Sequence, residues 1–215
     1  MTAAYAKTDF APARINGAKA ALSPAQSQRK PFAPTADQAL LARIAAGDKA
    51  AMHMLYTREK LRVYRFVLRI VRNPAVAEDL LSDVFLEIWN KAGAFEGRSA
   101  LSTWILGIAR FKALSALRRK SGVELDESLV ATLRDPSDDP EDAVSKQDTG
   151  DALRRCIGQL SAKHAEIVDL VYYHEKSVAE VAQIVGIPEN TVRTRMFFAR
   201  KRLAELLKME GIEHA

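Results

Sequence analysis

The 215-residue chain has little of what metal-binding, disulfide-bonded or membrane proteins depend on. Its single cysteine, Cys156, cannot form an internal disulfide, which fits a reducing compartment. The four histidines are scattered without metal-ligand spacing, so we expect no metal and no cofactor. No run approaches the roughly 20 apolar residues of a membrane span, and the N-terminus lacks the apolar core of a secretory signal. We therefore expect a cytoplasmic protein without membrane insertion.

Catalytic motifs are missing as well. The chain has no glycine-rich phosphate loop, no nucleophile in a glycine elbow, and no spaced carboxylate pair beyond surface helix faces. The alternating pattern of β-strands is also absent. These absences predict an all-α protein that is not an enzyme and has no catalytic residues.

Charge is distributed unevenly, although the net charge is only +5. Residues 121–150 hold nine acidic and two basic side chains and separate two basic-leaning blocks. We predict two small helical domains, 37–120 and 151–208, joined by this flexible acidic linker. Residues 1–36 are expected to form a disordered basic tail, with a functional arm as the alternative, and residues 209–215 a C-terminal tail. Two basic modules on one tether suggest nucleic-acid binding.

The first block carries the periodicity of four helices. They are expected over about 37–46, from an Asp48 cap to 71, over 75–91, and from Ser99 or Ser102 to about 120. The third helix is expected to bury Leu81, Val84, Phe85, Ile88 and Trp89. Its other face is polar and mostly acidic, with Glu78, Asp79, Ser82, Asp83 and Glu87.

In the fourth helix, the expected core stripe is Ile105, Ile108, Leu114 and Leu117. Around it, Trp104 and Phe111 alternate with Arg110 and other basic residues. Rings can stack on unpaired bases while cations hold phosphates. The alternative is that both aromatic residues belong to the core and that the basic edge is only solvated.

Residues 177–206 have the pattern of two helices joined by a short turn. Ser177 and Glu180 stand at capping-box spacing, Gly186 is expected to end the first helix at positive φ, and Pro188 to begin the second. The second helix is expected to bury Val192, Met196, Ala199, Leu203 and Leu206. Its outer face carries Asn190, Arg193, Thr194, Phe197 and Lys201, flanked by Arg195, Arg200 and Arg202. This favours a helix-turn-helix that reads the major groove over an αα-hairpin with a solvated basic face.

Two segments resemble a known family. The sequence AEDLLSDVFLEIW, followed by FEGRSALSTWILGIAR, resembles region 2 of the sigma-70 family, with the greatest likeness to extracytoplasmic-function (ECF, group IV) sigma factors. The sequence TVRTRMFFARKRL resembles the end of the region 4 helix-turn-helix, and the likeness covers nearly everything from 37 to 207. It implies an alternative sigma factor that binds core RNA polymerase, recognises the −35 and −10 promoter elements and melts DNA.

The resemblance also implies three sets of contact residues. The set expected to dock on the clamp of the largest polymerase subunit is Glu78, Asp79, Ser82, Asp83, Leu86, Glu87 and Trp89. The set expected at the −10 element and its flipped base is Phe95, Arg98, Ser99, Trp104, Arg110, Phe111, Arg118 and Arg119. The set expected at the −35 element is Ser177, Asn190, Thr191, Arg193, Thr194, Arg195, Phe197, Arg200 and Lys201. Further implied partners are the polymerase flap and an anti-sigma factor, with the acidic linker in the polymerase cleft.

The sequence departs from the family at two −10 positions. Phe111 and Ser115 stand where Asn and Asp are usual, which replaces a hydrogen-bonding contact by a stacking one.

Two other classes of protein remain as alternatives. A sigma-mimicking adaptor that sequesters an anti-sigma factor has no need of the basic recognition face. A conventional helix-turn-helix regulator has no need of the acidic face on 75–91 or of the acidic linker.

Overall fold

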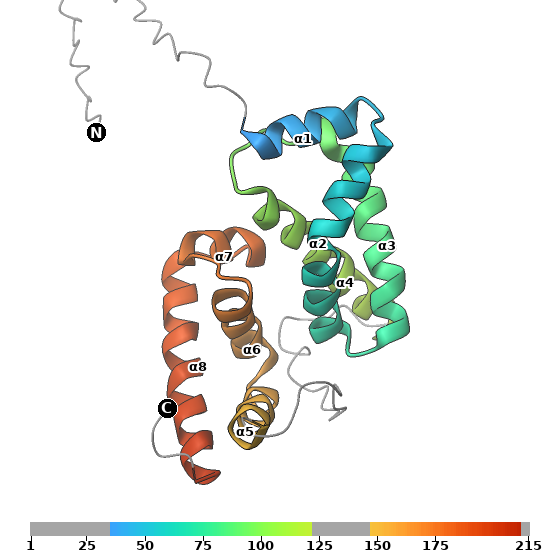
Figure 1. The fold of residues 1–215 in the computed structure, drawn as a ribbon. Helices are drawn as coiled ribbons and strands as arrows, with labels where there is room; N and C mark the ends of the chain where they lie inside the picture. Colours follow the sequence, from blue (N-terminus) through green and yellow to red (C-terminus); the bar gives the residue numbers. More distant parts are fainter. Residues whose placement is uncertain (1–34, 122–146, 212–215) are drawn as a thin grey trace, which may run out of the picture. The chain divides into compact units, whose positions relative to one another are not determined.

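The computed structural model describes residues 35–121 and 147–211, which are almost entirely helical (Figure 1). The described residues contain no strand, and the predicted all-α class is confirmed. The predicted tail over 1–36 and the predicted linker over 121–150 lie outside the described residues except at their edges, as do the last four residues of the C-terminal tail.

The first helical domain consists of four helices and one 3₁₀ turn. These elements are α1 (Ala36–Ala45), α2 (Lys49–Val71), α3 (Pro74–Lys91), η1 (Ala92–Ala94) and α4 (Leu101–Ser121). The side chain of Asp48 accepts hydrogen bonds from the backbone N–H groups of Ala50 and Ala51, which confirms the predicted start of α2. Asn73 caps α3 in the same way through the N–H of Val76, and Pro74 occupies the first helical position.

The second helical domain consists of α5 (Gln147–Gly158), α6 (Ala162–Val168), η3 (Asp169–Tyr173), α7 (Val178–Val185) and α8 (Glu189–Met209). The η3 segment continues α6 as a π-helix, and the N–H of His174 donates to the carbonyl of Asp169. A π-helical segment of this kind is rare and short in proteins.

The turn between α7 and α8 follows the prediction except at one residue. Gly186 adopts φ 75° and ends α7, as expected for a left-handed position. Pro188 was predicted as the first helical residue, but it is the N-cap of α8 and has an extended backbone. The helix begins one residue later, at Glu189. Since proline has no side-chain acceptor, α8 begins without a side-chain cap.

The helix α4 packs against α2, α3 and α7. Its buried apolar residues are Leu101, Ile105, Leu106, Ala109 and Ala113. The predicted stripe was therefore wrong in part: Ile108, Leu114 and Leu117 are half-buried. An apolar stripe assumes one packing partner, whereas α4 has neighbours on several sides.

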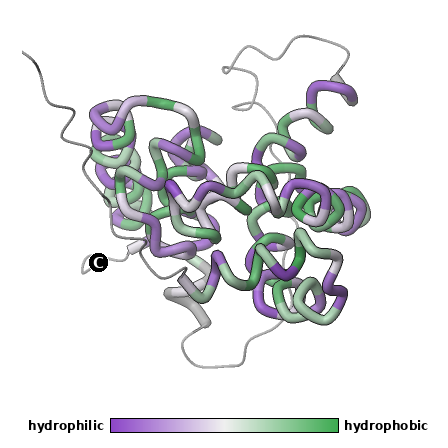
Figure 2. Tube along the Cα trace, turned by 90° about the horizontal axis from the view of Figure 1, so that it is seen from above, coloured by the Kyte–Doolittle hydropathy of each residue, from purple (hydrophilic) through white to green (hydrophobic). Residues whose placement is uncertain are grey.

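The other predicted core positions are mostly confirmed. On α3, Val84, Phe85 and Ile88 are buried, whereas Leu81 and Trp89 are half-buried against the core. On α8, Leu203 is likewise only half-buried. Figure 2 shows the hydrophobic positions recurring along the helices between hydrophilic ones.

Within residues 34–215, the residues that the structure describes form one compact unit with two apolar clusters. The larger cluster includes buried residues of α1 to α4 together with Ile167, Leu170, Val181, Ile184, Val185, Val192 and Met196 from the second domain. The smaller cluster, within the second domain, contains Cys156, Leu160, Val168, Ala199, Leu206 and Leu207. The larger core thus includes residues of both helical domains.

Candidate nucleic-acid and polymerase interface

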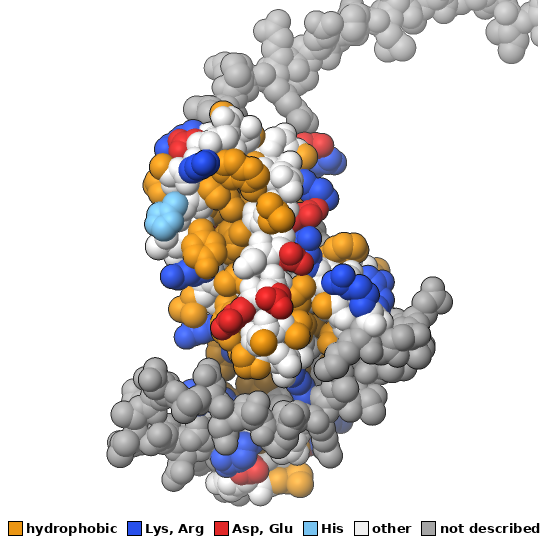
Figure 3. All heavy atoms as spheres, turned by 90° about the vertical axis from the view of Figure 1, so that its right-hand side faces the viewer, with side chains coloured by type: hydrophobic (Ala, Val, Ile, Leu, Met, Phe, Trp, Pro, Cys, Tyr) orange, Lys and Arg blue, Asp and Glu red, His pale blue; other side chains and the backbone are white. Residues whose placement is uncertain are grey.

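The outer face of α3 presents acidic side chains to solvent. Glu78, Asp79, Ser82 and Asp83 are exposed, and Leu86 beside them is 60% exposed. Figure 3 shows acidic and hydrophobic side chains lying next to one another on the side of the molecule that includes α3. Negative charge around an exposed leucine suits a basic helical partner with an apolar contact point.

Two members of this predicted set differ from the rest. Glu87 is partly buried and pairs with Lys91 at 2.5 Å and Lys112 at 3.3 Å. Hydrogen bonds from these two lysines lower the pKa of its carboxyl group. Trp89 is half-buried and packs on the apolar core. Glu87 and Trp89 therefore contact other residues of the first domain and are less available to a partner than the exposed acidic residues of α3.

The exposed apolar surface extends from α3 onto α2, where sequence reasoning did not place it. Met54, Tyr56 and Leu61 are 57%, 36% and 55% exposed. The ring of Tyr56 meets Phe85 of α3 edge to face at 4.8 Å between centroids. None of the three predicted sets of contact residues includes Met54, Tyr56 or Leu61.

The predicted −10 residues include an aromatic platform formed by Phe95, Trp104 and Phe111. Phe95, in the loop before α4, packs against Trp104 with ring centroids 5.3 Å apart. Both rings are half-buried, whereas Phe111 is 67% exposed. The core alternative is thus wrong for Phe111 and holds in part for Trp104. Arg98 is 81% exposed and pairs with Glu96.

Phe111 lines two surface hollows along α4. One hollow is lined by Asp83, Phe111, Lys112, Ser115, Arg118 and Arg119. The other is lined by residues that include Ser99, Trp104, Ile108, Phe111 and Lys112. An exposed ring with cations on both sides can stack a base and hold a phosphate.

Arg110 differs from the other predicted −10 residues because its guanidinium is already occupied. Its Nε donates to Oε1 of Glu166 on α6 at 2.8 Å, and its Nη2 donates to Oε2 at 3.3 Å. The two side chains are only 19% and 15% exposed. This bidentate pair joins the two helical domains.

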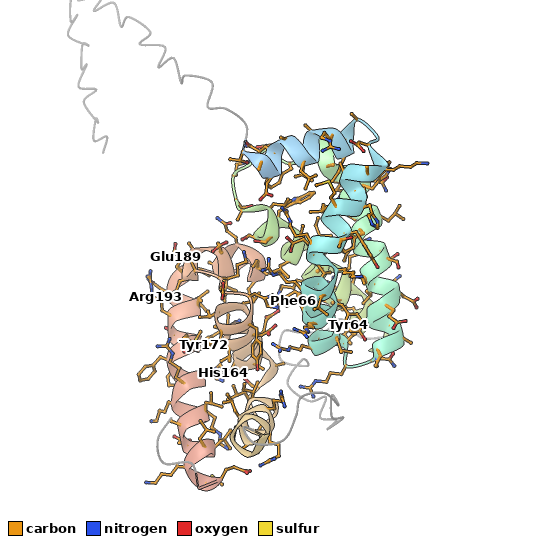
Figure 4. The ribbon with its side chains drawn as sticks, viewed as in Figure 1. Tyr64, Phe66, His164, Tyr172, Glu189 and Arg193 are labelled. Carbon is orange, nitrogen blue, oxygen red and sulfur yellow. The ribbon has the colours of Figure 1, made fainter. Side chains whose placement is uncertain are left out.

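The outer face of α8 carries the predicted −35 residues, and most of them are exposed. Arg193 contacts Glu189 at 3.1 Å and Asn190 at 3.3 Å, as Figure 4 shows for Glu189 and Arg193 on the outer edge of α8. Thr194 donates to the backbone carbonyl of Asn190. Phe197 is 63% exposed, and Lys201 is exposed beside it on the same face.

The flanks of this face are anchored to the rest of the second domain. Arg200 donates to the hydroxyl oxygen of Tyr172 at 2.9 Å. Thr191 and Arg195 are half-buried. Ser177 donates to and accepts from Glu180 in the capping box of α7, so its hydroxyl is engaged within the protein. Phe198, which sequence reasoning missed, is 50% exposed and meets Phe197 edge to face at 5.4 Å.

A buried ionic cluster was not predicted by sequence reasoning. Asp169 pairs with Arg69 of α2, and Nε2 of His174 lies 3.4 Å from the same carboxyl group. Burial, together with the charges of Arg69, Arg62 and Lys176, lowers the pKa of His174 to about 4. No local sequence signal marked this cluster, because its members come from α2 and η3.

Within 35–121 and 147–211, no group of three or more His, Cys, Asp or Glu side chains could hold a metal ion. Among the helices of the same residues, none is long and apolar enough to cross a membrane.

Comparisons with known proteins assign both halves of the chain. Residues 55–123 match the family profile described as sigma-70 region 2, and residues 150–203 match that described as sigma-70, region 4. The ECF RNA polymerase sigma factor SigK of Mycobacterium sp. (strain KMS) is 29% identical over 174 residues, which cover 80% of this chain and 90% of the relative. SigK of Mycobacterium tuberculosis is 28% identical over 174 residues, covering 79% and 92%.

Solved structures show the same fold. The sigma factor RpoE from Bartonella quintana, in complex with the anti-sigma factor NepR, is 25% identical with a TM-score of 0.55. The match covers 73% of this chain and 96% of that one. CnrH, in complex with the cytosolic domain of CnrY, is 20% identical with a TM-score of 0.57, over 80% and 97% of the two chains. This second likeness concerns the fold alone.

Proposed function

The chain belongs to the sigma-70 family of RNA polymerase sigma factors and is an alternative, ECF-type sigma factor that directs transcription initiation; on this premise we propose which surfaces carry out each step. Members of this family are non-enzymatic initiation factors. The observation that carries the assignment is the presence of two chemically different exposed faces on separate helical domains, acidic on α3 and basic on α8.

The acidic face of α3 docks on core polymerase. Its exposed members are Glu78, Asp79, Ser82, Asp83 and Leu86, and Glu87 and Trp89 hold the helix in place. Carboxylates steer the encounter with a basic coiled coil of the clamp, and the exposed leucine supplies an apolar contact. Tyr56 and Leu61 of α2 add to the apolar part of this surface.

Residues 95–119 engage the −10 element. The aromatic platform of Phe95, Trp104 and Phe111 stacks unpaired bases, and Arg98, Arg118 and Arg119 hold the phosphates of the opened strand. Ser99 and Arg110 belong to the same proposed set. Exposure of Phe111 next to a hollow with two arginines is the feature that supports this role.

The outer face of α8 reads the −35 element in the major groove. Arg193, Thr194, Phe197 and Lys201 face base edges, and Asn190 positions Arg193. Contacts to phosphates come from the flanks, with Ser177, Thr191, Arg195 and Arg200. The helix-turn-helix geometry and the basic outer face support this assignment.

Promoter DNA and core RNA polymerase, through its clamp and flap, are the proposed partners, and the cytoplasm is the proposed location. An anti-sigma factor is a further proposed partner, because the RpoE structure contains the anti-sigma factor NepR. The domain boundaries at 37–120 and 151–208, with 1–36, 121–150 and 209–215 as tails and linker, belong to the same proposal.

The deciding experiment is run-off transcription with purified bacterial core polymerase on a genomic promoter library, with and without the protein. We expect discrete start sites only when the protein is present, preceded by two shared sequence elements. If no start sites form with active core polymerase and folded protein, the sigma-mimicking adaptor becomes the better explanation. Tight binding to duplex DNA without polymerase would instead favour a conventional helix-turn-helix regulator.

A further inference from the structure

The helix α2 carries a row of exposed arginines that none of the three proposed contact surfaces uses. Four of them lie in the helix and the fifth is its C-cap residue, and they follow one another at intervals of four, three, four and three residues. At 100° and 1.5 Å per residue, this spacing keeps the row within about 80° of the helix circumference and makes it about 21 Å long. We call it the arginine stripe; its members are Arg58, Arg62, Arg65, Arg69 and Arg72, all of them exposed.

The stripe is not balanced by acidic residues of its own helix. Glu59 is the single acidic residue of α2. Side chains three or four residues apart are neighbours on a helix, and like charges at these distances destabilise it. The stripe places four such pairs of like charges in succession, whereas a merely solvated helix face carries charges of both signs. A row of cations that costs helix stability indicates a negatively charged partner outside the helix.

Neighbouring carboxylates hold the first two arginines in place without covering them. The buried side chain of Glu59 accepts a hydrogen bond from Nε of Arg58 at 3.0 Å and from Nη1 of Arg62 at 3.2 Å. Asp37 of α1 lies 3.0 Å from Nη1 of Arg58. The two arginine side chains are still 46% and 45% exposed. Because a guanidinium has five N–H donors, both groups can bind a further acceptor while they keep these contacts.

The other end of the stripe lies beside the proposed −10 residues. Arg69 contacts Asp169, and Arg110 of α4 contacts Glu166, so two helices place arginines on carboxylates that are three residues apart in α6 and η3. Residues three apart on a helix are neighbours, and α2 also packs along α4. The stripe therefore continues the proposed −10 surface from α4 onto α2.

The chemistry of the stripe fits the phosphate backbone of duplex DNA. Guanidinium groups bind phosphates through two parallel N–H bonds. One strand of a duplex presents a phosphate every 3.4 Å or so along the axis, so the length of the stripe spans about six phosphates. Single strands are usually held by stacking on exposed rings. The two aromatic residues within the stripe's span are not exposed: Phe66 is buried and Tyr64 is half-buried, and Figure 4 labels both on α2.

We propose that the arginine stripe of α2 binds the phosphate backbone of duplex DNA next to the −10 element. Only its position along the promoter rests on the proposed function of residues 95–119. Contacts to phosphates carry no sequence information. The stripe therefore contributes affinity and orientation, and the choice of promoter stays with the residues that contact bases.

The first test uses the free full-length chain and a duplex of scrambled sequence, and it needs neither polymerase nor promoter. Affinity is measured over a series of salt concentrations, because each phosphate contact adds about 0.9 to the slope of log affinity against log salt. We expect Arg65→Gln to reduce the slope by about 0.9, and Arg65→Lys, which keeps the charge, to restore it. The variant that combines Arg62→Gln with Arg65→Gln should reduce the slope by about 1.8.

The matched control combines Lys49→Gln with Lys60→Gln. Both lysines are exposed on α2, and the helical period places them on the side opposite to the stripe. This variant loses the same charge as the double arginine variant, and its slope should equal that of the natural chain. Circular dichroism of all variants confirms that each is folded to the same extent before affinities are compared.

The second test measures binding of the core-bound protein to a forked fragment of a promoter found by run-off transcription. We expect Arg65→Gln to reduce the salt slope by the same amount as on scrambled duplex, and to do so equally on a fragment with an altered −10 sequence. On the single strand of the −10 element alone, Arg65→Gln should leave the slope unchanged.

Each other outcome overturns the proposal. Unchanged slopes in both arginine variants remove the phosphate contact, and an equal fall in the lysine control assigns the effect to net charge. A loss on the single strand alone places the contact on opened DNA. A loss of affinity for core polymerase with an unchanged DNA slope means that the stripe binds an acidic protein surface. If the free chain responds as expected but core polymerase yields no start sites, the stripe's contact with DNA stands and the sigma assignment fails.

Discussion

Arg193 is the residue whose substitution tests the proposed promoter recognition most directly. Its side chain is 60% exposed, and Glu189 and Asn190 hold it on the outer face of α8. We expect Arg193→Ala to weaken use of a specific promoter about 10- to 100-fold, because one good base contact contributes about 1–3 kcal/mol. Run-off transcription measures this loss. Binding to core polymerase should be unchanged, and Lys208→Ala, an exposed cation in the last turn, is the matched control. Equal loss of core binding would contradict the role.

His174 is the residue that gives the fold a pH dependence. In the folded chain its pKa is lowered to about 4 from 6.5, so the unfolded state binds more protons at intermediate pH. The folded form therefore loses stability as pH falls from about 6.5 towards 4, and the loss is about 2 kcal/mol at pH 5.

Chemical unfolding at pH 7.5 and pH 5 measures this effect. In His174→Gln the difference between the two pH values should become smaller, because the titrating group is gone. The carboxyl group of Glu180, with its pKa lowered to about 2, loses its stabilising effect only below about pH 4.5, outside this window. An unchanged pH dependence in His174→Gln would show that other groups dominate.

At the scale of elements, the turn between α7 and α8 depends on backbone conformation. Gly186 adopts φ 75°, and the space that a Cβ would occupy has no neighbouring atom within 4 Å, so a substitution meets strain in the backbone and no steric clash. We expect Gly186→Ala to lower the free energy of unfolding by about 1–2 kcal/mol. Gly186→Asn should cost less, because asparagine tolerates the left-handed region. Chemical unfolding of both variants measures the two losses, and equal losses would point to packing.

The outer face of α3 allows the proposed docking on polymerase to be tested separately from DNA recognition. Asp79 and Asp83 are exposed on its outer face. We expect Asp79→Lys combined with Asp83→Lys to weaken binding to core polymerase by at least about tenfold, because two negative charges become positive against a basic partner. Equilibrium binding to core polymerase measures this.

The matched control for the α3 variant combines Glu205→Lys with Glu210→Lys, which makes the same change of charge in the last turns and C-cap of α8. Its affinity for core polymerase should remain near that of the natural chain. If both variants lose the same affinity, net charge explains the effect and the α3 face does not.

At the scale of the whole molecule, the two helical domains share one large apolar cluster. We expect thermal unfolding to occur in a single transition, because exposing one half removes packing from the other. Both tryptophans, Trp89 and Trp104, lie in the first domain, so their fluorescence follows that domain, whereas far-ultraviolet circular dichroism follows both. The two signals should coincide in the natural chain.

In the variant that combines Glu166→Arg with Asp169→Asn, the circular dichroism transition should separate into two steps. Tryptophan fluorescence should then follow only one of them. Two steps in the natural chain would contradict the shared core. This result is independent of promoter binding and of core polymerase.

The sequence alone determined the local features of this protein. Capping groups such as Asp48 and Ser177, and the glycine at 186, act within a few residues, so the beginnings and ends of the helices could be predicted. The outer faces of α3 and α8 could also be predicted, because exposed charge follows the helical period. The family resemblance rested on these two helices and on the segment FEGRSALSTWILGIAR, which lies before and within α4.

Tertiary structure decided what depends on contacts between distant residues. The pairing of Arg110 with Glu166 spans 56 positions, and no local pattern encodes it. The burial of Asp169 and His174 likewise depends on α2, whose Arg69 and Phe66 contact them. The stripe on α4 was predicted only in part, because three neighbouring helices, and no single partner, select its buried positions. Local spacing specifies a helix and its polar face, whereas burial and ion pairing are properties of the packed chain.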